Sequence, residues 1–486
     1  MAWESPRRRA PELHRPKLAH VPRSSISWSL LLSSTTYFVF LVAIFFLYWP
    51  MARSRMLALA VILFANYFFY AKWDLVYLAL IPAASAVDFL IGLGLQRQWS
   101  APARRALVTA SITMNLALLL GARYVPLLFG RVAPAWHWTL PLSLSFYAFQ
   151  AMTYTIDLYR GDTKGTRSLL AHLAAVSFFP TTLAGPITRV SSLITQFEKR
   201  TMLDPAEGGR ALFLIGVGLM KKFLVADYLA GNFVNRVFDF PNLYTGAEAL
   251  IAVYAYAIQI YYDFSGYTDI ALGSALLLGI KLPVNFNRPY AAENIADFWR
   301  RWHISLSNWL RDYLYFSLPG KRSRIMPYTN LIATMVLGGL WHGASWNFAV
   351  WGALHGFALA FVRLWQTRFG PAKGTGAWRC VNIAVTFHFV AFAWIFFRAP
   401  DFDTAMLMLA RIGSLSVSLA NVTLPLAAVI ALGALAHFVP KRWYDWSLAA
   451  YSRAPFYAQA AVLALLVLGL QTVAQQGAAP FIYTRF

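Results

Sequence analysis

Apolar stretches separated by short polar breaks run along almost the whole chain. A helix that crosses a bilayer needs about 20 predominantly apolar residues. Candidate stretches lie near 30–49, 56–71, 75–95, 106–129, 138–159, 168–185, 211–230, 246–262, 266–281, 328–345, 347–367, 381–398, 419–438 and 456–474. Because several of them are too short to span, we expect an all-α integral membrane protein with about eleven transmembrane helices and some re-entrant or interfacial helices.

The segment 285–321 breaks this pattern, because it is too polar to span and yet rich in aromatic residues. Asn294 followed by Asp297 is typical of a helix N-cap and predicts a helix over about 295–315. At about 100° per residue, this helix has an apolar face and an opposite polar face. The apolar face holds Phe298, Trp302, Leu306, Trp309 and Tyr313, and the polar face holds Arg300, His303, Ser307 and Arg311. The polar face indicates either a solvated interfacial helix or a reactive surface.

Composition supports a membrane protein, since 59% of the residues are hydrophobic and only 13% are charged. Too few charges are present to cover a soluble protein of this length, which excludes a secreted globular enzyme, a disordered chain and an ordinary nucleic-acid binder. Strand-length alternation typical of an outer-membrane barrel is also missing from the pattern. The net charge is +22, and the basic residues lie mostly in the polar breaks. There they either anchor loops to anionic lipid or hold an anionic co-substrate.

The two ends of the chain suggest a simple domain organisation. Residues 1–27 form a basic tail that we expect to be mobile, and the apolar run after it is too long for a signal peptide. We therefore interpret 28–486 as one transmembrane domain. Cys380 is the single cysteine. It excludes a disulfide framework within the chain, and we interpret it as a residue at a helix end.

Among the nine histidines, His342 is distinguished by its place in the run Gly338-Gly339-Leu340-Trp341-His342-Gly343 at the end of an apolar helix. An ionisable residue at membrane depth indicates a functional site, with helix packing as the alternative. No histidine pair has metal-ligand spacing, so we expect no metal. Gly-rich phosphate loops and a Gly-x-Ser-x-Gly elbow are likewise missing from the sequence.

Two carboxylates lie in the aromatic run 261–269, at Asp263 and Asp269. Buried carboxylates need partners. We expect Arg288, Arg300 and Arg301 to pair with them, and we favour this structural role over catalysis.

Several of these motifs together resemble the bacterial branch of the membrane-bound O-acyltransferases. They are Tyr262-Asp263-Phe264-Ser265-Gly266-Tyr267, Asn285-Phe286-Asn287-Arg288-Pro289-Tyr290, the run from Asp297 to Ser307, Arg311-Asp312-Tyr313-Leu314-Tyr315 and the run from Gly338 to Gly343. That branch includes alginate O-acetyltransferases and teichoic acid D-alanyl transferases. The resemblance implies a ring of transmembrane helices around a central tunnel.

The resemblance also implies the residues of the site. His342 and His303 match the family's catalytic histidines, with His342 as the general base or as an aid to thiolate departure, and His303 orienting the donor or stabilising an oxyanion. The expected supporting or donor-binding residues are Arg300, Arg301, Ser307, Asn308, Arg311, Asp263 and Trp341. For the arginines, and for Lys321 and Arg322, lipid anchoring remains an equal alternative.

Three functions follow from these observations. The first is transfer of an acetyl group from a cytoplasmic thioester, acetyl-CoA, to a cell-surface polysaccharide such as alginate, directly or through an extracytoplasmic acceptor protein. The second is D-alanyl transfer to teichoic acid from a carrier protein. The third is a non-enzymatic transporter, although the paired broken helices typical of transporters are not evident. We expect a multi-pass protein of the bacterial inner membrane with no tightly bound cofactor and no nucleic-acid partner.

Overall fold

The computed structural model describes residues 31–72, 76–129, 142–182, 185–199, 202, 204–320, 323, 325–370 and 374–474, and every regular element within these ranges is helical. This confirms the all-α class for the described residues. The expected basic tail 1–27 lies outside them, as do Lys321 and Arg322.

The first half of the chain forms a helical array that ends in one long helix. Its elements are α1 (Thr35–Met51), α2 (Arg55–Ala71), α3 (Val76–Leu95), α4 (Ala101–Phe129), α5 (Leu142–Arg160), α6 (Leu169–Val176), α7 (Phe179–Thr182), α8 (Val190–Glu198), α9 (Pro205–Met220), η2 (Lys221–Asp227), η3 (Ala230–Val234), α10 (Asn235–Asp239), η4 (Pro241–Leu243) and α11 (Gly246–Leu277). A capping box of Thr245 and Glu248 starts α11, because each side chain binds a backbone N–H of the other residue. Most of α11 is buried, and it packs along α9 and η2.

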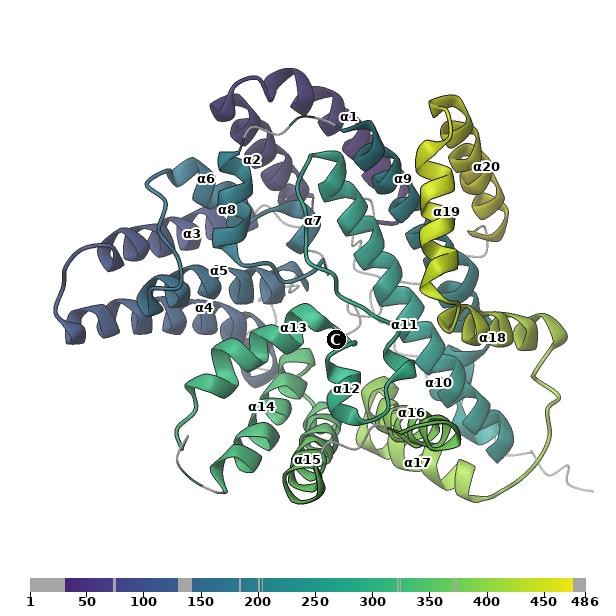
Figure 1. Cartoon of the computed structure of the whole chain (residues 1–486). Coiled ribbons are helices and arrows are strands. Elements are labelled where there is room, and N and C mark those ends of the chain that lie inside the picture. The colour runs from purple at the N-terminus through teal and green to yellow at the C-terminus, as the bar shows by residue number, and fades with distance from the viewer. Residues whose placement is uncertain are drawn as a thin grey trace, which may run out of the picture.

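The second half contains the polar segment and the remaining helices. Its elements are η5 (Pro289–Ala291), α12 (Ile295–Trp299), α13 (Ile304–Trp309), η6 (Leu310–Leu314), η7 (Tyr315–Ser317), α14 (Met326–His342), α15 (Trp346–Phe369), α16 (Ala377–Arg398), α17 (Phe402–Gly413), α18 (Leu424–His437), α19 (Lys441–Arg453) and α20 (Phe456–Ala474). Figure 1 shows α12 and the start of α13 near the middle of the molecule. The turn between them contacts α11, since the ring centroids of His303 and Phe264 lie 4.7 Å apart. The polar segment is therefore placed at the centre of the array.

Four helical stretches within the described ranges are long and apolar enough to cross a membrane: α3, residues 101–121 of α4, α15 and α16. A fifth candidate is formed by α18 and α19 together, which are bent by 92°. The described residues also contain shorter apolar helices of 10–17 residues, among them α1 and α2. The expectation of about eleven spans is not confirmed by these lengths and stays a prediction.

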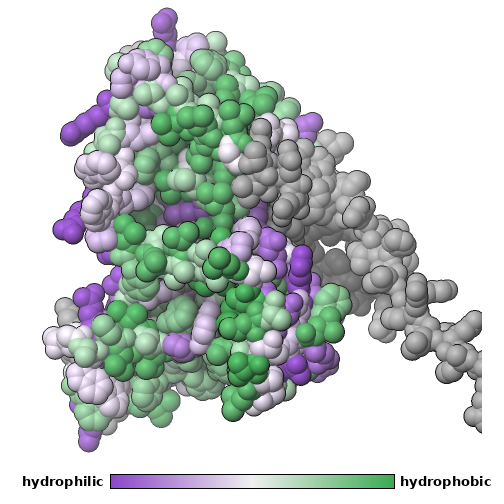
Figure 2. All heavy atoms as spheres, turned by 90° about the vertical axis from the view of Figure 1, so that its right-hand side faces the viewer, coloured by the Kyte–Doolittle hydropathy of each residue, from purple (hydrophilic) through white to green (hydrophobic). Residues whose placement is uncertain are grey.

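Many large apolar side chains are exposed on the outer surface. Large side chains such as Leu90, Phe361 and Leu465 are 64%, 63% and 70% exposed. Figure 2 shows hydrophobic residues spread over much of one face, with hydrophilic residues at its margins and in a recess near its middle. Apolar patches of this extent are uncommon on soluble monomers, and they indicate a surface that faces the bilayer.

The prediction of one continuous helix over 295–315 is wrong. Helix α12 ends at Trp299, a turn follows, and α13 begins only at Ile304. The predicted N-cap is confirmed, because the Asn294 side chain accepts a hydrogen bond of 2.9 Å from the Asp297 N–H. The apolar stripe is buried as expected, from Phe298 to Tyr313. Burial of the stripe therefore follows the sequence pattern, although the helix itself is interrupted.

The prediction that arginines pair with Asp263 and Asp269 is also wrong. Asp263 pairs with Lys222 at 2.8 Å and Asp269 pairs with Lys221 at 2.5 Å, both from η2. Arg300 and Arg301 instead bind Asp297 at 3.5 Å and 2.9 Å. These lysines precede their aspartates by 41 and 48 positions, and they reach them because η2 packs along α11. Local spacing does not reveal this contact.

Candidate active site

His303 lies at the break between α12 and α13 and points into the protein. Its backbone is left-handed, with φ 41° and ψ 55°, and it occupies the N-cap position of α13. Its side chain is only 1% exposed, whereas Arg300 and Arg311 from the same predicted face are exposed. The left-handed backbone at His303 turns its imidazole into the protein. The side chains of the predicted polar face therefore do not lie on one surface.

Asn285 holds this turn from the other side. Its side-chain oxygen Oδ1 accepts from the Ser305 N–H at 3.1 Å and from the Ser305 hydroxyl at 2.9 Å, and it lies 3.1 Å from His303 Nδ1. The backbone contributes a further bond, from the Ile304 N–H to the Asn285 carbonyl at 2.9 Å. A non-glycine residue in the left-handed region is costly unless its surroundings impose it, and these contacts supply that constraint.

Aromatic rings enclose His303. Phe264 of α11 meets it edge to face at 4.7 Å between ring centroids, and Phe146 of α5 stacks on it at 6.4 Å. Burial among these rings lowers the pKa of His303 from 6.5 to about 3. The ring is therefore neutral near pH 7. Its Nε2 has no hydrogen-bond partner among the residues that the structure describes.

His342 is the last residue of α14 and is also buried, at 4% exposure. Its ring contacts Trp351 of α15 at 5.4 Å and Phe397 of α16 at 5.1 Å between centroids. The close packing of α14 on α15 depends on glycine, because a Cβ on Gly339 would lie 2.2 Å from the Phe348 carbonyl oxygen. Backbones can approach so closely only where a side chain is missing, and this contact fixes the end of α14 that carries His342.

A chain of ring contacts joins the two histidines. Phe146 stacks on His303 and meets Trp341 at 5.5 Å, and Trp341 meets His342 at 4.8 Å. Trp341 also stacks on Phe149 at 5.2 Å. The fold thus brings both predicted histidines, 39 positions apart in sequence, to the same aromatic cluster, with Phe146 and Trp341 linking their rings.

A pocket of about 450 Å³ opens beside the His303 turn. Ile304 and Ser305 form its wall next to the histidine. The rest of the lining comprises Thr153, Ile187, Thr188, Arg189, Ser192, Lys281, Leu282, Pro283, Val284, Asn308, Trp309, Asp312 and Tyr313. The lining thus combines hydroxyl groups and one amide with apolar side chains. It also contains two cations, Arg189 and Lys281.

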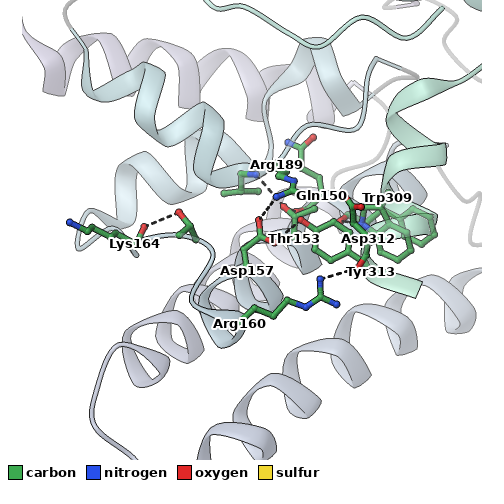
Figure 3. A network of polar contacts seen from close by, with 12 residues as sticks. Gln150, Thr153, Asp157, Arg160, Lys164, Arg189, Trp309, Asp312 and Tyr313 are labelled. Atoms are coloured by element: carbon green, nitrogen blue, oxygen red, sulfur yellow. Dashed lines mark hydrogen bonds and ion pairs between the residues drawn. The ribbon is translucent and has the colours of Figure 1, made fainter. Parts of the chain in front are cut away.

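A polar network holds one wall of this pocket in place (Figure 3). Arg189 binds the Asp312 carboxylate at 2.8 Å and lies 3.9 Å from Asp157 of α5. The Tyr313 hydroxyl donates to Asp157 at 2.7 Å, and Arg160 donates to the Asp312 carbonyl at 2.9 Å. These contacts hold η6 against the end of α5 and the start of α8, so the wall of the pocket is fixed by interactions between separate elements.

The other predicted supporting residues are dispersed. Among them, Asn308 lines the pocket. The Ser307 hydroxyl donates to the Trp302 carbonyl at 3.2 Å, and Arg311 binds Asp312 at 2.8 Å. Arg300 and Arg301 are engaged by Asp297, as described above, and Asp263 is buried with Lys222. The structure therefore brings His303, His342 and Trp341 into one aromatic cluster, places the exposed Asn308 at the pocket, and gives the remaining residues local partners.

Sequence reasoning missed Asn285, Arg189 and Phe146 as site residues. The motif containing Asn285 was noticed, but nothing in it shows that this amide is buried while Asn287 is exposed. Arg189 lies in a polar break between two apolar stretches, and its sequence context does not distinguish it from other loop arginines. Only the tertiary contacts distinguish these residues.

Comparison with known proteins shows which protein family this chain is similar to. A model of the membrane-bound O-acyltransferase family matches residues 160–399, a range that contains both histidines. The chain is 40% identical over 400 residues to the probable alginate O-acetylase AlgI of Azotobacter vinelandii, covering 78% of each protein. It is 33% identical to the peptidoglycan O-acetyltransferase of Helicobacter pylori, covering 74% of each. Similarity to the teichoic acid D-alanyltransferase of Bacillus subtilis is lower, 28% over 54% of this chain and 69% of that one.

Proposed function

The chain belongs to the membrane-bound O-acyltransferase family and is therefore a membrane enzyme that transfers acyl groups to oxygen. We propose that it moves an acetyl group from a thioester donor to hydroxyls of a cell-surface or exported polysaccharide such as alginate. Relatives named for O-acetylation share 40% and 33% identity with it, against 28% for a D-alanyl transferase. This order favours acetyl over D-alanyl transfer, and the family match leaves no support for a non-enzymatic transporter.

The observation that carries the proposal is the neutral, buried His303 ring beside a pocket. Acyl transfer requires the acceptor hydroxyl to lose its proton as its oxygen bonds to the thioester carbonyl carbon. The C–S bond then breaks, and the thiolate takes up a proton. General acid–base help of this kind is worth about 10²–10⁴-fold in rate. His303 and His342 bring two imidazoles to the aromatic cluster, and imidazole is the side-chain group that most often serves as a general acid or base.

The pocket suits the arm of a thioester donor. An arm built of amides and short carbon chains needs hydroxyl and amide partners between apolar surfaces, as Thr153, Ser192 and Asn308 provide. Arg189 and Lys281 line the same pocket and pair with Asp312 and Glu207, so they would bind the phosphates of acetyl-CoA by exchanging these carboxylates for phosphate. The donor roles inferred for Arg300, Arg301 and Arg311 remain predictions, since these three arginines do not belong to the lining of this pocket.

The location follows from the same reaction. An apolar outer surface places the enzyme in a bilayer, and a cytoplasmic thioester with an extracytoplasmic polysaccharide requires a multi-pass protein of the bacterial inner membrane. Direct transfer, and relay through an extracytoplasmic acceptor protein, both fit a site at the centre of the helical array.

The test is acetyl transfer by the purified protein in liposomes. With radiolabelled acetyl-CoA and alginate we expect label on the polysaccharide, or on an added acceptor protein. Replacement of His303 or His342 by alanine should abolish this, whereas His388→Ala should not, because His388 is an exposed histidine on α16. Transfer of labelled D-alanine from a charged carrier protein, without acetyl transfer, would overturn the proposal.

A further inference from the structure

We propose that Asn285 is a positioning residue that holds His303 in a single tautomer, with the proton on Nδ1 and with Nε2 as the atom that accepts the proton of the acceptor hydroxyl. The part about the hydroxyl rests on the proposed function, whereas the tautomer itself does not. The inference also changes the role that the resemblance implied, in which His303 orients the donor or stabilises an oxyanion.

The orientation of the Asn285 amide follows from a backbone contact. The Ser305 N–H can only donate, and it lies 3.1 Å from one end of the amide. That end must therefore be the oxygen, because two N–H groups cannot bind each other. The amide nitrogen then faces the Thr268 hydroxyl at 3.5 Å. A rotated amide would place nitrogen against the Ser305 N–H and lose that bond.

The tautomer of His303 follows from the amide. His303 Nδ1 lies 3.1 Å from the Asn285 oxygen. Since this oxygen carries no hydrogen, the hydrogen of the bond must be on Nδ1. A neutral imidazole has one N–H, so Nε2 carries a lone pair. Nε2 has no partner among the described residues, and is thus left as a free acceptor.

The surroundings keep the ring neutral and fixed. The ring and hydrogen-bond contacts of the His303 side chain with described residues are to Phe146 of α5, Phe264 of α11 and Asn285 of the preceding loop, and none of these three side chains titrates. A second backbone bond, from the Asn287 N–H to the Arg301 carbonyl at 2.9 Å, holds the loop to the turn. A base whose orientation is set before the substrate arrives needs no reorganisation during the reaction.

The chemical consequence is a defined proton path. A neutral ring with an unprotonated Nε2 is unable to donate from that atom to an oxyanion, but it is able to accept. The hydroxyl proton moves to Nε2 while the hydroxyl oxygen bonds to the thioester carbonyl carbon. The resulting imidazolium is stabilised by the Asn285 oxygen, and it returns the proton to the thiolate that leaves.

The test compares substitutions at Asn285 with a matched one at Asn287, an exposed asparagine in the same loop. Asn285→Asp keeps the acceptor but adds a negative charge beside the ring. The acid limb of the kcat–pH profile should then move up by about one unit or more. Asn285→Ala should lower kcat by about 10–100-fold, as loss of an orienting partner typically does, with KM little changed. Asn287→Asp should change neither. An Asn285→Asp enzyme with an unshifted acid limb would refute the proposal.

A second measurement needs neither activity nor a stable variant at Asn285. Nitrogen-15 NMR of histidine-labelled protein separates protonated from unprotonated ring nitrogens, and the His303 signals are identified by their loss in His303→Gln. We expect a protonated Nδ1 and an unprotonated Nε2 at pH 7; the reverse pattern would contradict the proposal. Because this readout is independent of turnover, a failure of the tautomer and a failure of the proposed acetyl transfer are distinguishable.

Discussion

The two histidines have different surroundings, although the motifs present them as a pair. His303 has an amide partner and a left-handed backbone, whereas His342 closes a long helix and meets the rings of Trp351 and Phe397. A histidine used only for packing tolerates glutamine, which preserves hydrogen bonding and much of the volume. A histidine that carries a proton does not tolerate it, since an amide does not titrate.

Substitution of His342 distinguishes these roles. We expect His342→Ala to reduce the acyl-transfer rate by about 10²–10⁴-fold, and His342→Gln not to restore it. His388→Gln serves as the control. The double variant His303→Ala/His342→Ala should be hardly slower than the slower single variant, because residues that act on one transition state are not additive. Near-normal rates for a well-folded His342→Gln protein would remove His342 from the mechanism.

The buried His303 also predicts a pH dependence of stability. Its pKa is lowered by burial from 6.5 to about 3, so between these values the unfolded chain binds a proton that the folded protein does not. The free energy of unfolding should therefore fall as the pH drops below about 6.5. His303→Gln has no ring to protonate and should show a smaller decline. Thermal unfolding in detergent at pH 7.5 and pH 5 measures this; equal declines would contradict it.

Among the elements, the break between α12 and α13 and the contact between α14 and α15 determine where the histidines lie. The first turns His303 inward, and the second fixes the end of α14. In α14 and α15 the approach depends on small residues, since a Cβ on Gly352 would lie 2.3 Å from the Met335 carbonyl oxygen. A side chain there must push the two helices apart.

Gly339→Ala tests this contact. We expect a loss of about 1–3 kcal/mol in stability, as in other overpacked sites, together with a reduced transfer rate because His342 lies three residues further along α14. Gly208→Ala in α9 is the matched control, because a Cβ there meets no atom of the described residues within 4 Å. Thermal unfolding and transfer rates of both variants provide the measurement, and a Gly339→Ala protein as stable as the control would show that the helices separate without cost.

On the scale of the whole molecule, the number of spans is still a prediction. If the number of spans is eleven, it is odd, and residues near the two ends of the chain would lie on opposite sides of the membrane. Cys380 is the single cysteine and is exposed, so Cys380→Ser provides a cysteine-free background that we expect to retain most activity. In that background, Ser25→Cys and Thr484→Cys should react with a membrane-impermeant thiol reagent from opposite sides. Labelling of both from one side would require an even number of spans.

Local pattern was sufficient for much of this protein. The long apolar stretches predicted an all-helical membrane protein, and the stripe from Phe298 to Tyr313 is buried as predicted. The N-cap at Asn294 was also correct. These features depend on residues within one or two helical turns, where periodicity and capping chemistry act directly. The motifs, taken together, identified the family.

The tertiary structure alone decided the geometry of the site. The turn at His303 is held by Asn285, 18 positions earlier, and Asp263 is paired by Lys222, 41 positions earlier. Neither contact has a local signature, because each depends on how separate elements pack. The helical class thus followed from the pattern along the chain, whereas the catalytic roles of the two histidines stay a prediction from the motifs. The burial of one of them, its tautomer and its partner were determined only when the chain brought α5, α11 and the polar segment together.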